Sequence, residues 1–344
     1  YLEKADILIA LGEYEKAIES CNTLLDRDAK DIGAFIKKSA VFFRQEKFEE
    51  ALKCIEDAMA ISVDYPALNY YKGEILRNMG KPEESIGFFD KYIEKVPEQP
   101  NPYVGRAKSL YLMQEYEEAL DCCEKAISLD DNNVEGYYSK AQVLMQMDRY
   151  EDVLEVLDRI KEIDRDFKMV YYDRAEVYKK MGDYEKALEN MDIYLEEFPD
   201  DGYGHEKKAN ILFGMGRFDD AVRECDKAIE IEPGLADAYY GKGYILYYTG
   251  QFKESLSCFD KVIELDPKSA YAYYSKGNSL KYLGDLEGAL ENYNEAINLW
   301  HEFAECYSAI AHLYFIVGNY ANSMIFYDRV ENLRPDYIYS YIGK

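Results

Sequence analysis

Residues 202–235 read GYGHEKKANILFGMGRFDDAVRECDKAIEIEPGL, and this stretch sets the pattern of the whole chain. Apolar and small side chains recur four and three residues apart in its first half, which is the spacing of a helix with one buried face. Gly216 is expected to end that helix, since glycine adopts the left-handed backbone conformation without a side-chain penalty. A second helix is expected to start behind Asp219 and to end before Pro233, whose ring cannot continue it. The stretch therefore predicts two helices joined by a tight turn.

The same unit recurs every 34 residues along the chain, without insertion or deletion. One column of the repeat holds a small or compact side chain throughout, at Ala17, Ala51, Ser85, Ala119, Val153, Ala187, Ala221, Ser255, Ala289 and Ser323. A fixed period of this length is typical of stacked supersecondary units. We therefore expect an all-α protein with a single array over residues 1–344. Its repeats are expected at approximately 1–31, 32–65, 66–99, 100–133, 134–167, 168–201, 202–235, 236–269, 270–303 and 304–337, with a partial one at 338–344.

Two further columns carry a family resemblance. An aromatic residue stands early in the first helix, at Tyr1, Phe35, Tyr103, Tyr137, Tyr171, Tyr239, Tyr273 and Tyr307. A small residue follows four positions later, at Ala5, Ser39, Gly73, Ala107, Ala141, Ala175, Ala209, Gly243, Gly277 and Ala311. With the turn glycine and the closing proline, these columns resemble the tetratricopeptide repeat over all 344 positions. The resemblance implies a right-handed superhelical α-solenoid of helix-turn-helix units, whose first helices line a concave groove that holds peptides or partner proteins.

The charge of the chain restricts its partners. Sixty-seven acidic residues against forty-one basic ones give a formal net charge of −26, which repels phosphate backbones and anionic lipid headgroups. We therefore expect neither a nucleic acid partner nor a membrane partner. No apolar run approaches the roughly 20 residues that span a bilayer, and the chain opens on Tyr1 without a basic-then-apolar leader. These features predict a cytoplasmic protein, with a leader upstream of Tyr1 as the open alternative.

The sequence offers no set of residues for catalysis or metal binding. Most of the seven cysteines occupy core positions of the second helix, and Cys122–Cys123, the one close pair, has no histidine near enough for a zinc-like spacing. His205 and His301 fall in ordinary repeat positions, and His312 has no partner in a spacing that suggests a catalytic triad. We therefore expect no enzyme activity, no cofactor and no metal within these residues.

A basic residue directly precedes the small residue of the first helix in nearly every repeat. The column consists of Lys4, Lys38, Lys72, Arg106, Lys140, Arg174, Lys208, Lys242 and Lys276, and it is broken at Ile310. A long side chain at the seam between repeats buries its stem and sends its charge outward. We expect these residues to pair with acidic ends of neighbouring second helices, such as Glu230–Glu232 and Glu264–Asp266. Ligand binding is the alternative.

Some departures from the repeat predict irregularity. Val153 brings extra methylene groups to a close helix crossing, and Asp148 takes the turn-glycine position. Because such groups push helices apart, we expect a change of superhelical pitch near residues 134–167. The chain also begins inside a first repeat and stops seven residues into an eleventh. We therefore expect a fragment of a longer protein, with uncapped ends that allow self-association.

Tyrosines gather in the columns that the resemblance assigns to the groove. The candidate partner-binding residues are Tyr240, Tyr244, Tyr247, Tyr248, Tyr271, Tyr274, Asn278, Lys281 and Tyr282. Tyrosine offers a large apolar face and a hydroxyl at low entropy cost, which suits peptide capture. The alternative is that the rings stack on one another across adjacent helices and stiffen the array. No three successive repeats supply the lysine, asparagine and arginine set of chaperone-binding members, so we do not expect a carboxylate clamp.

These observations predict a protein-interaction scaffold or adaptor that binds a partner peptide or protein in its groove. The alternative is a regulatory or targeting arm of a larger enzyme whose catalytic domain lies outside this segment. RNA binding by a related helical-pair repeat is disfavoured by the acidic charge.

Overall fold

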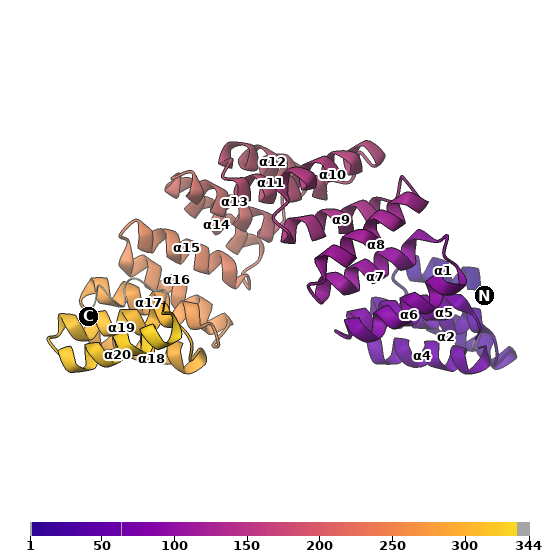
Figure 1. Ribbon diagram of the computed structural model, residues 1–344, viewed down its shortest axis with the longest axis horizontal. Helices are drawn as coiled ribbons and strands as arrows, with labels where there is room; N and C mark the ends of the chain where they lie inside the picture. The colour runs from indigo at the N-terminus through magenta and orange to yellow at the C-terminus, as the bar shows by residue number, and fades with distance from the viewer. Residues whose placement is uncertain (1, 63, 336–344) are drawn as a thin grey trace. The chain divides into compact units, whose positions relative to one another are not determined.

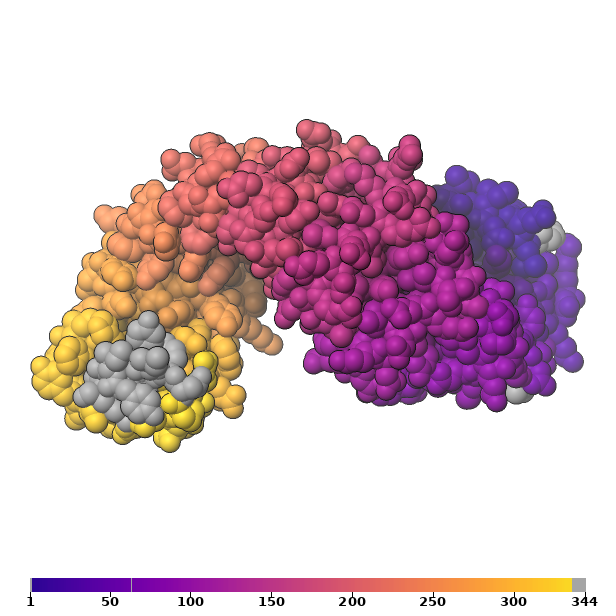
Figure 2. Space-filling model, turned by 45° about the horizontal axis from the view of Figure 1, so that its top comes forward, coloured from indigo at the N-terminus to yellow at the C-terminus, as the bar shows by residue number. Residues whose placement is uncertain are grey.

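The computed structural model describes residues 2–62 and 64–335, which form twenty α-helices and no strand. The predicted all-α solenoid of helix-turn-helix units is confirmed, and Figure 1 shows the helix pairs following one another along the chain. Contacts divide the structure into two compact parts, Tyr1–Val170 and Tyr171–Lys344, which we call the N-terminal and C-terminal halves. In the space-filling view, side chains fill the spaces between neighbouring helices of each half (Figure 2).

The helices alternate between the first and second position of each repeat. Those of the N-terminal half are α1 (Leu2–Ala10), α2 (Tyr14–Arg27), α3 (Ile32–Arg44), α4 (Phe48–Ile61), α5 (Pro66–Asn78), α6 (Pro82–Lys95), α7 (Pro100–Leu112), α8 (Tyr116–Leu129), α9 (Val134–Gln146) and α10 (Tyr150–Ile163). The rest are α11 (Met169–Met181), α12 (Tyr184–Glu197), α13 (Gly202–Gly214), α14 (Phe218–Ile231), α15 (Ala236–Tyr248), α16 (Phe252–Leu265), α17 (Ala270–Leu283), α18 (Leu286–Leu299), α19 (Ala304–Ile316) and α20 (Tyr320–Leu333). The helix expected behind Asp219 begins one residue earlier, at Phe218, and ends before Pro233 as predicted.

The small column that defines the repeat lies in the core. All ten of its side chains are buried, and Val153 is as buried as the alanines. Hydrogen bonds cross the helix pair at this column: Ala51 O accepts from Ser39 Oγ of α3 at 2.9 Å, and Ser323 Oγ donates to Ala311 O at the same distance. Backbones approach this closely only where side chains are small. The column therefore sets the spacing of the two helices in each repeat.

Turn residues between the two helices adopt the predicted left-handed conformation. Gly216 has a φ of +73°, and the glycines in the same position of other repeats have similar values. Glu46, Gln114 and Asp148 occupy this position in repeats that lack the glycine, with φ of 58°, 63° and 55°. A left-handed backbone costs a residue with a side chain about 1 kcal/mol or more. The array keeps one turn geometry even where the sequence does not favour it.

Bulky rings of the second helix are matched to glycines of the first. A Cβ atom added to Gly243 would lie 2.8 Å from Phe259 Cε1, and one added to Gly277 would lie 2.6 Å from Tyr293 Cε1. Gly73 stands in the same relation to Phe89, at 2.9 Å. Other repeats have alanine or serine at the position of Gly243 and a smaller residue at the position of Phe259. The exception is the repeat with Ala311, which has Tyr327 at the position of Phe259. A glycine in the first helix thus makes room for a large ring in the second helix of the same repeat.

The basic column forms ion pairs from repeat to repeat. Lys242 Nζ pairs with Asp226 of α14, and Lys276 Nζ lies 2.7 Å from Asp260 Oδ1 of α16. The same spacing of 16 residues joins Lys72 to Glu56, Arg106 to Asp90, Lys140 to Glu124 and Lys208 to Asp192. Packing between repeats is thus the observed role. The expected partners at Glu230–Glu232 and Glu264–Asp266 were wrong, because the basic stems reach the acidic residue one helical turn earlier.

The boundary between the two halves falls between Val170 and Tyr171, three residues after the repeat at 134–167. Val153, Leu157 and Ile160 of that repeat are fully or almost fully buried in α10. The change of pitch near residues 134–167 stays a prediction, as does the division of the chain into one array of ten repeats. The partial repeat expected at 338–344 lies outside the described residues.

Candidate partner-binding face

The candidate tyrosines come from α15 and α17, the first helices of two successive repeats in the C-terminal half, which contact each other. Because one 34-residue period separates them, Tyr240 and Tyr274 hold equivalent positions, and so do Tyr248 and Tyr282. We call the predicted set the tyrosine face, and it consists of Tyr240, Tyr244, Tyr247, Tyr248, Tyr271, Tyr274, Asn278, Lys281 and Tyr282.

Four tyrosines of this face are exposed: Tyr244, Tyr248, Tyr271 and Tyr282, with 43% to 61% of each residue accessible to solvent. Each ring is nevertheless held by an aromatic neighbour. Tyr244 and Tyr248 pack edge-on against Phe213 of α13, at centroid distances of 5.6 and 5.3 Å. Tyr282 stacks on Phe252 at 4.8 Å with an interplanar angle of 5°. These rings offer apolar surface in a fixed orientation.

The other three tyrosines are half-buried and serve the packing between helices. The hydroxyl of Tyr240 lies 3.2 Å from Ser275 Oγ of α17, and burial raises its pKa. Tyr247 lies 5.7 Å from both Phe252 and Tyr282, and burial again raises the pKa of the phenol. Tyr274 packs against Phe303 at 5.0 Å and Tyr293 at 6.0 Å. Stacking, which the sequence left as the alternative, describes these three residues.

The two polar members of the face have different surroundings. Asn278 is engaged, since its side-chain oxygen accepts a hydrogen bond from the Tyr293 hydroxyl at 2.8 Å. Lys281 has no ion pair with a carboxylate in the described ranges; its ammonium lies 5.3 Å from the centroid of the Tyr282 ring. Burial lowers its pKa. On α19, burial together with the Lys281 charge lowers the pKa of His312.

The sequence analysis missed residues that extend the face along both neighbouring helices. Phe213 of α13 holds the same repeat position as Tyr247, and it supports Tyr244 and Tyr248. Phe315 and Ile316 of α19 hold the positions of Lys281 and Tyr282, and both are exposed. The signal was present, because all of these residues share columns with the predicted ones.

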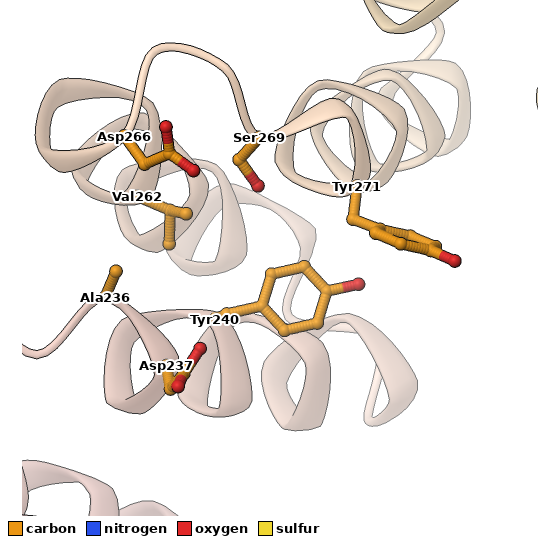
Figure 3. Close-up of a pocket in the computed structure, with 7 residues that line it drawn as sticks. All are labelled: Ala236, Asp237, Tyr240, Val262, Asp266, Ser269 and Tyr271. Carbon is orange, nitrogen blue, oxygen red and sulfur yellow. The ribbon is translucent and has the colours of Figure 1, made fainter. Parts of the chain in front are cut away.

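Two pockets open beside first helices. One, of about 370 Å³, is lined in part by Tyr240 and Tyr271 of the tyrosine face (Figure 3). The other, of about 220 Å³, lies in the N-terminal half between α3 and α5, where Phe43, Tyr70 and Tyr71 line it. The sequence analysis did not single out the second pocket, since its aromatic residues are fewer and more scattered.

His205 and the seven cysteines, whose side chains could bind a metal ion or take part in acid–base chemistry, are buried among the helices. No group of three or more histidine, cysteine, aspartate or glutamate side chains within residues 2–62 and 64–335 could hold a metal ion. His205 is buried, with Nδ1 2.6 Å from Glu224 Oε2 and Nε2 3.0 Å from Pro199 O. All seven cysteines are buried as free thiols, and burial raises the pKa of Cys225 to about 12. Among the described helices, none is both long and apolar enough to cross a bilayer.

Comparison with protein families gives matches along most of the chain. Models described as tetratricopeptide repeat match residues 1–31, 38–100, 172–236, 236–269, 258–291 and 304–337, and one described as TPR repeat matches 277–318. A model described as anaphase-promoting complex, cyclosome, subunit 3 matches residues 78–160. Among curated proteins, the DnaJ homolog subfamily C member 3 of Mus musculus is 25% identical over 99 residues, which are 29% of this chain and 20% of that protein. The human protein of the same name is 24% identical over the same length. The match therefore spans about a fifth of these relatives.

Solved structures with a similar fold cover most of the chain. A tetratricopeptide repeat protein from Parabacteroides merdae has a TM-score of 0.59 at 19% identity, covering 72% of this chain and 98% of its own. The APC/C hetero-tetramer Cut9-Hcn1 matches with a TM-score of 0.56 at 11% identity, covering 98% of this chain and 81% of that chain. Yeast Tom70 matches with a TM-score of 0.55 at 14% identity, covering 99% and 93%. At these identities the likeness shows the fold alone.

Proposed function

Since this chain belongs to the tetratricopeptide repeat family, we propose that it is a protein-interaction scaffold whose tyrosine face binds a partner peptide or protein in a concave groove. The observation that carries the proposal is the set of four exposed tyrosine rings on α15 and α17. Each is oriented by an aromatic neighbour, so little side-chain entropy is lost when a partner covers it. Tyrosine is also enriched among the residues that dominate binding energy at protein interfaces.

The polar groups of the face support binding along a peptide rather than capture of its terminal carboxylate. Lys281 is the one basic member of the face, and Asn278 already accepts a hydrogen bond from Tyr293. A clamp for a carboxylate would need several convergent donors. The exposed hydroxyls and apolar ring surfaces instead suit a partner segment that presents both apolar side chains and backbone polar groups. We propose a cytoplasmic setting for this interaction, in keeping with the acidic charge of the chain.

A peptide selected from a displayed random library against the whole chain provides the test. We expect the double substitution Tyr244→Ala and Tyr248→Ala to weaken binding of the selected peptide at least tenfold, since each ring contributes on the order of 1 kcal/mol or more. Tyr65→Ala is the matched control, because Tyr65 is a similarly exposed tyrosine at the start of α5 in the other half. Failure to enrich any peptide, or equal affinity of the double variant and the control, would refute the proposal.

Helices α19 and α20 support a second proposal, self-association through their exposed apolar side chains. Apolar residues at the turn between α19 and α20 are exposed: Phe315, Ile316, Val317, Tyr320, Met324 and Ile325. Several exposed large apolar side chains on two adjacent helices are typical of an interaction site. Sedimentation velocity should show concentration-dependent association that Ile325→Lys abolishes. A sedimentation coefficient that is independent of concentration would exclude it.

A further inference from the structure

The pocket of about 370 Å³ lies between α15, the end of α16 and the start of α17 (Figure 3). The residues that matter for its chemistry are Asp237, Tyr240, Val262, Asp266, Ser269 and Tyr271. Its volume is near the lower end of the roughly 300–1,000 Å³ typical of ligand pockets. The pocket is therefore of a size for one large side chain.

Two other repeats fill the equivalent place with an aromatic side chain of their own. Phe303, one period after Ser269, is almost fully buried, and its ring lies 5.0 Å from Tyr274 and 4.7 Å from Trp300. In the N-terminal half, Phe167 packs edge-on against Tyr138 at 5.4 Å, three periods before Ser269 and Tyr240. The pocket exists because Ser269 is too small to cover Tyr240. A planar group from elsewhere can take the place of the missing ring.

Carboxylates distinguish this place from its equivalent in the next repeat, where Tyr271 and Trp300 hold the positions of Asp237 and Asp266. Asp237 comes from the first turn of α15, and Asp266 caps the end of α16 where the next repeat has Trp300. Asp266 Oδ1 accepts the backbone N–H of Lys268 at 3.0 Å. Within the described residues, neither carboxylate forms an ion pair. The pocket thus combines an open aromatic ring with two negative charges that have no cationic partner.

We propose that this pocket binds an arginine side chain of the protein partner. A guanidinium group is planar, packs on an aromatic face, and donates hydrogen bonds to carboxylates. A phenylalanine side chain would match the ring alone and would leave the two carboxylates without a cationic partner. The net charge of −26 also attracts a basic segment over a distance. The inference rests on the proposed scaffold function and names the chemistry of its partner.

A single capped amino acid tests the pocket without knowledge of the partner. N-acetyl-arginine N-methylamide is titrated into the whole chain and followed by saturation-transfer NMR, with the citrulline analogue as an uncharged probe of the same shape. We expect saturable binding of the arginine probe, and at least fivefold weaker binding of the citrulline probe. Asp237→Asn and Asp266→Asn should each weaken arginine binding by about two- to fivefold, as expected for partly exposed ion pairs.

Ser269→Phe is the decisive variant, because it fills the pocket with the residue that the next repeat already uses. Ser269 Oγ accepts a weak hydrogen bond from Ala272 N at 3.4 Å, whereas Phe303 begins α19 without any side-chain cap. The variant should fold and lose arginine binding. Arginine binding that survives in Ser269→Phe, equal binding of the citrulline probe, or no saturable binding at all would overturn the inference. If Ser269→Phe does not fold, unchanged binding to the two asparagine variants overturns it.

Peptide selection separates this inference from the scaffold proposal. Peptides selected on the whole chain should contain an arginine whose replacement by citrulline weakens binding to the parent protein but not to Ser269→Phe. Peptides that depend on Tyr244 and Tyr248 yet need no arginine would overturn the arginine pocket and leave the scaffold function standing. Binding of the capped arginine without any selectable peptide would support the arginine pocket and overturn the scaffold function.

Discussion

Gly243→Ala should destabilise the C-terminal half, and the size of the effect should depend on Phe259. A Cβ atom at position 243 would lie 2.8 Å from Phe259 Cε1 and 3.0 Å from Cys258 Cβ. The Phe259 ring is completely buried. Overpacking of this kind costs about 1–3 kcal/mol of unfolding free energy. The expected loss for Gly243→Ala is therefore in that range.

A double-mutant cycle isolates the contact between the two positions. Phe259→Met alone should cost about 1 kcal/mol, and with Gly243→Ala it recreates the alanine–methionine pair of Ala175 and Met191. We expect the double variant to be no less stable than Phe259→Met, so that the coupling energy is about 1–3 kcal/mol. Urea unfolding followed by circular dichroism measures the differences. Hydrogen exchange of α15 and α16 amides localises them, since a repeat array can unfold in segments.

Gly241→Ala is the matched control on the same helix. A Cβ atom at Gly241 would meet only Cys225 Sγ, at 3.7 Å, so this change should raise stability by about 0.5–1 kcal/mol through helix propensity. If Gly243→Ala behaves like Gly241→Ala, or if its effect simply adds to that of Phe259→Met, the shared-volume explanation of the core is wrong.

Two further predictions concern charge and backbone. Burial penalises the charged form of Glu224, but hydrogen bonds from His205 and Lys227 outweigh that penalty and hold its pKa at about 2. Because this folded-state pKa lies below the ordinary 4.5, the ionised carboxylate stabilises the fold fully above about pH 5. This stabilisation is lost as the pH falls toward 2. Acid titration of the unfolding free energy should lose on the order of 3 kcal/mol over that window, and Glu224→Gln should remove this part of the slope; an unchanged slope would contradict the assignment. Gln114→Gly should raise the unfolding free energy by about 1 kcal/mol, because residue 114 is held at a φ of 63°. Gly216→Gln should lower the unfolding free energy by a similar amount. Thermal unfolding of both variants checks this, and a destabilising Gln114→Gly would count against it.

Most of the fold follows from the period of the sequence, for identifiable reasons. Each small residue in the column of Ala17 must be buried for a helix pair to close, so the column reports packing directly. The turn glycine reports a backbone conformation that few other residues adopt readily. The exact ends of the helices and the partners in the ion pairs were harder to predict from the sequence. Lys242 reaches Asp226 rather than Glu230 because the direction of a long side chain depends on the crossing of two helices.

The candidate site could be predicted as a set of residues but not as a surface. Tyr248 and Tyr274 are both tyrosines of first helices, yet one is exposed and the other packs between Phe303 and Tyr293. Exposure depends on the residues opposite each ring in adjacent helices, which the repeat column itself does not encode. The pocket beside Tyr240 was missed for the same reason, since it arises from the small size of Ser269, which lies beyond the whole of α16 in the sequence.

The scaffold proposal is tested most directly by the affinity of a selected peptide for the parent chain and for the Tyr244→Ala, Tyr248→Ala variant, measured by fluorescence anisotropy on folded proteins. Both side chains are exposed, so their removal leaves the buried columns intact. We predict at least a tenfold loss of affinity with unchanged circular dichroism. Equal affinity for the two proteins would contradict the claim that the tyrosine face binds the partner.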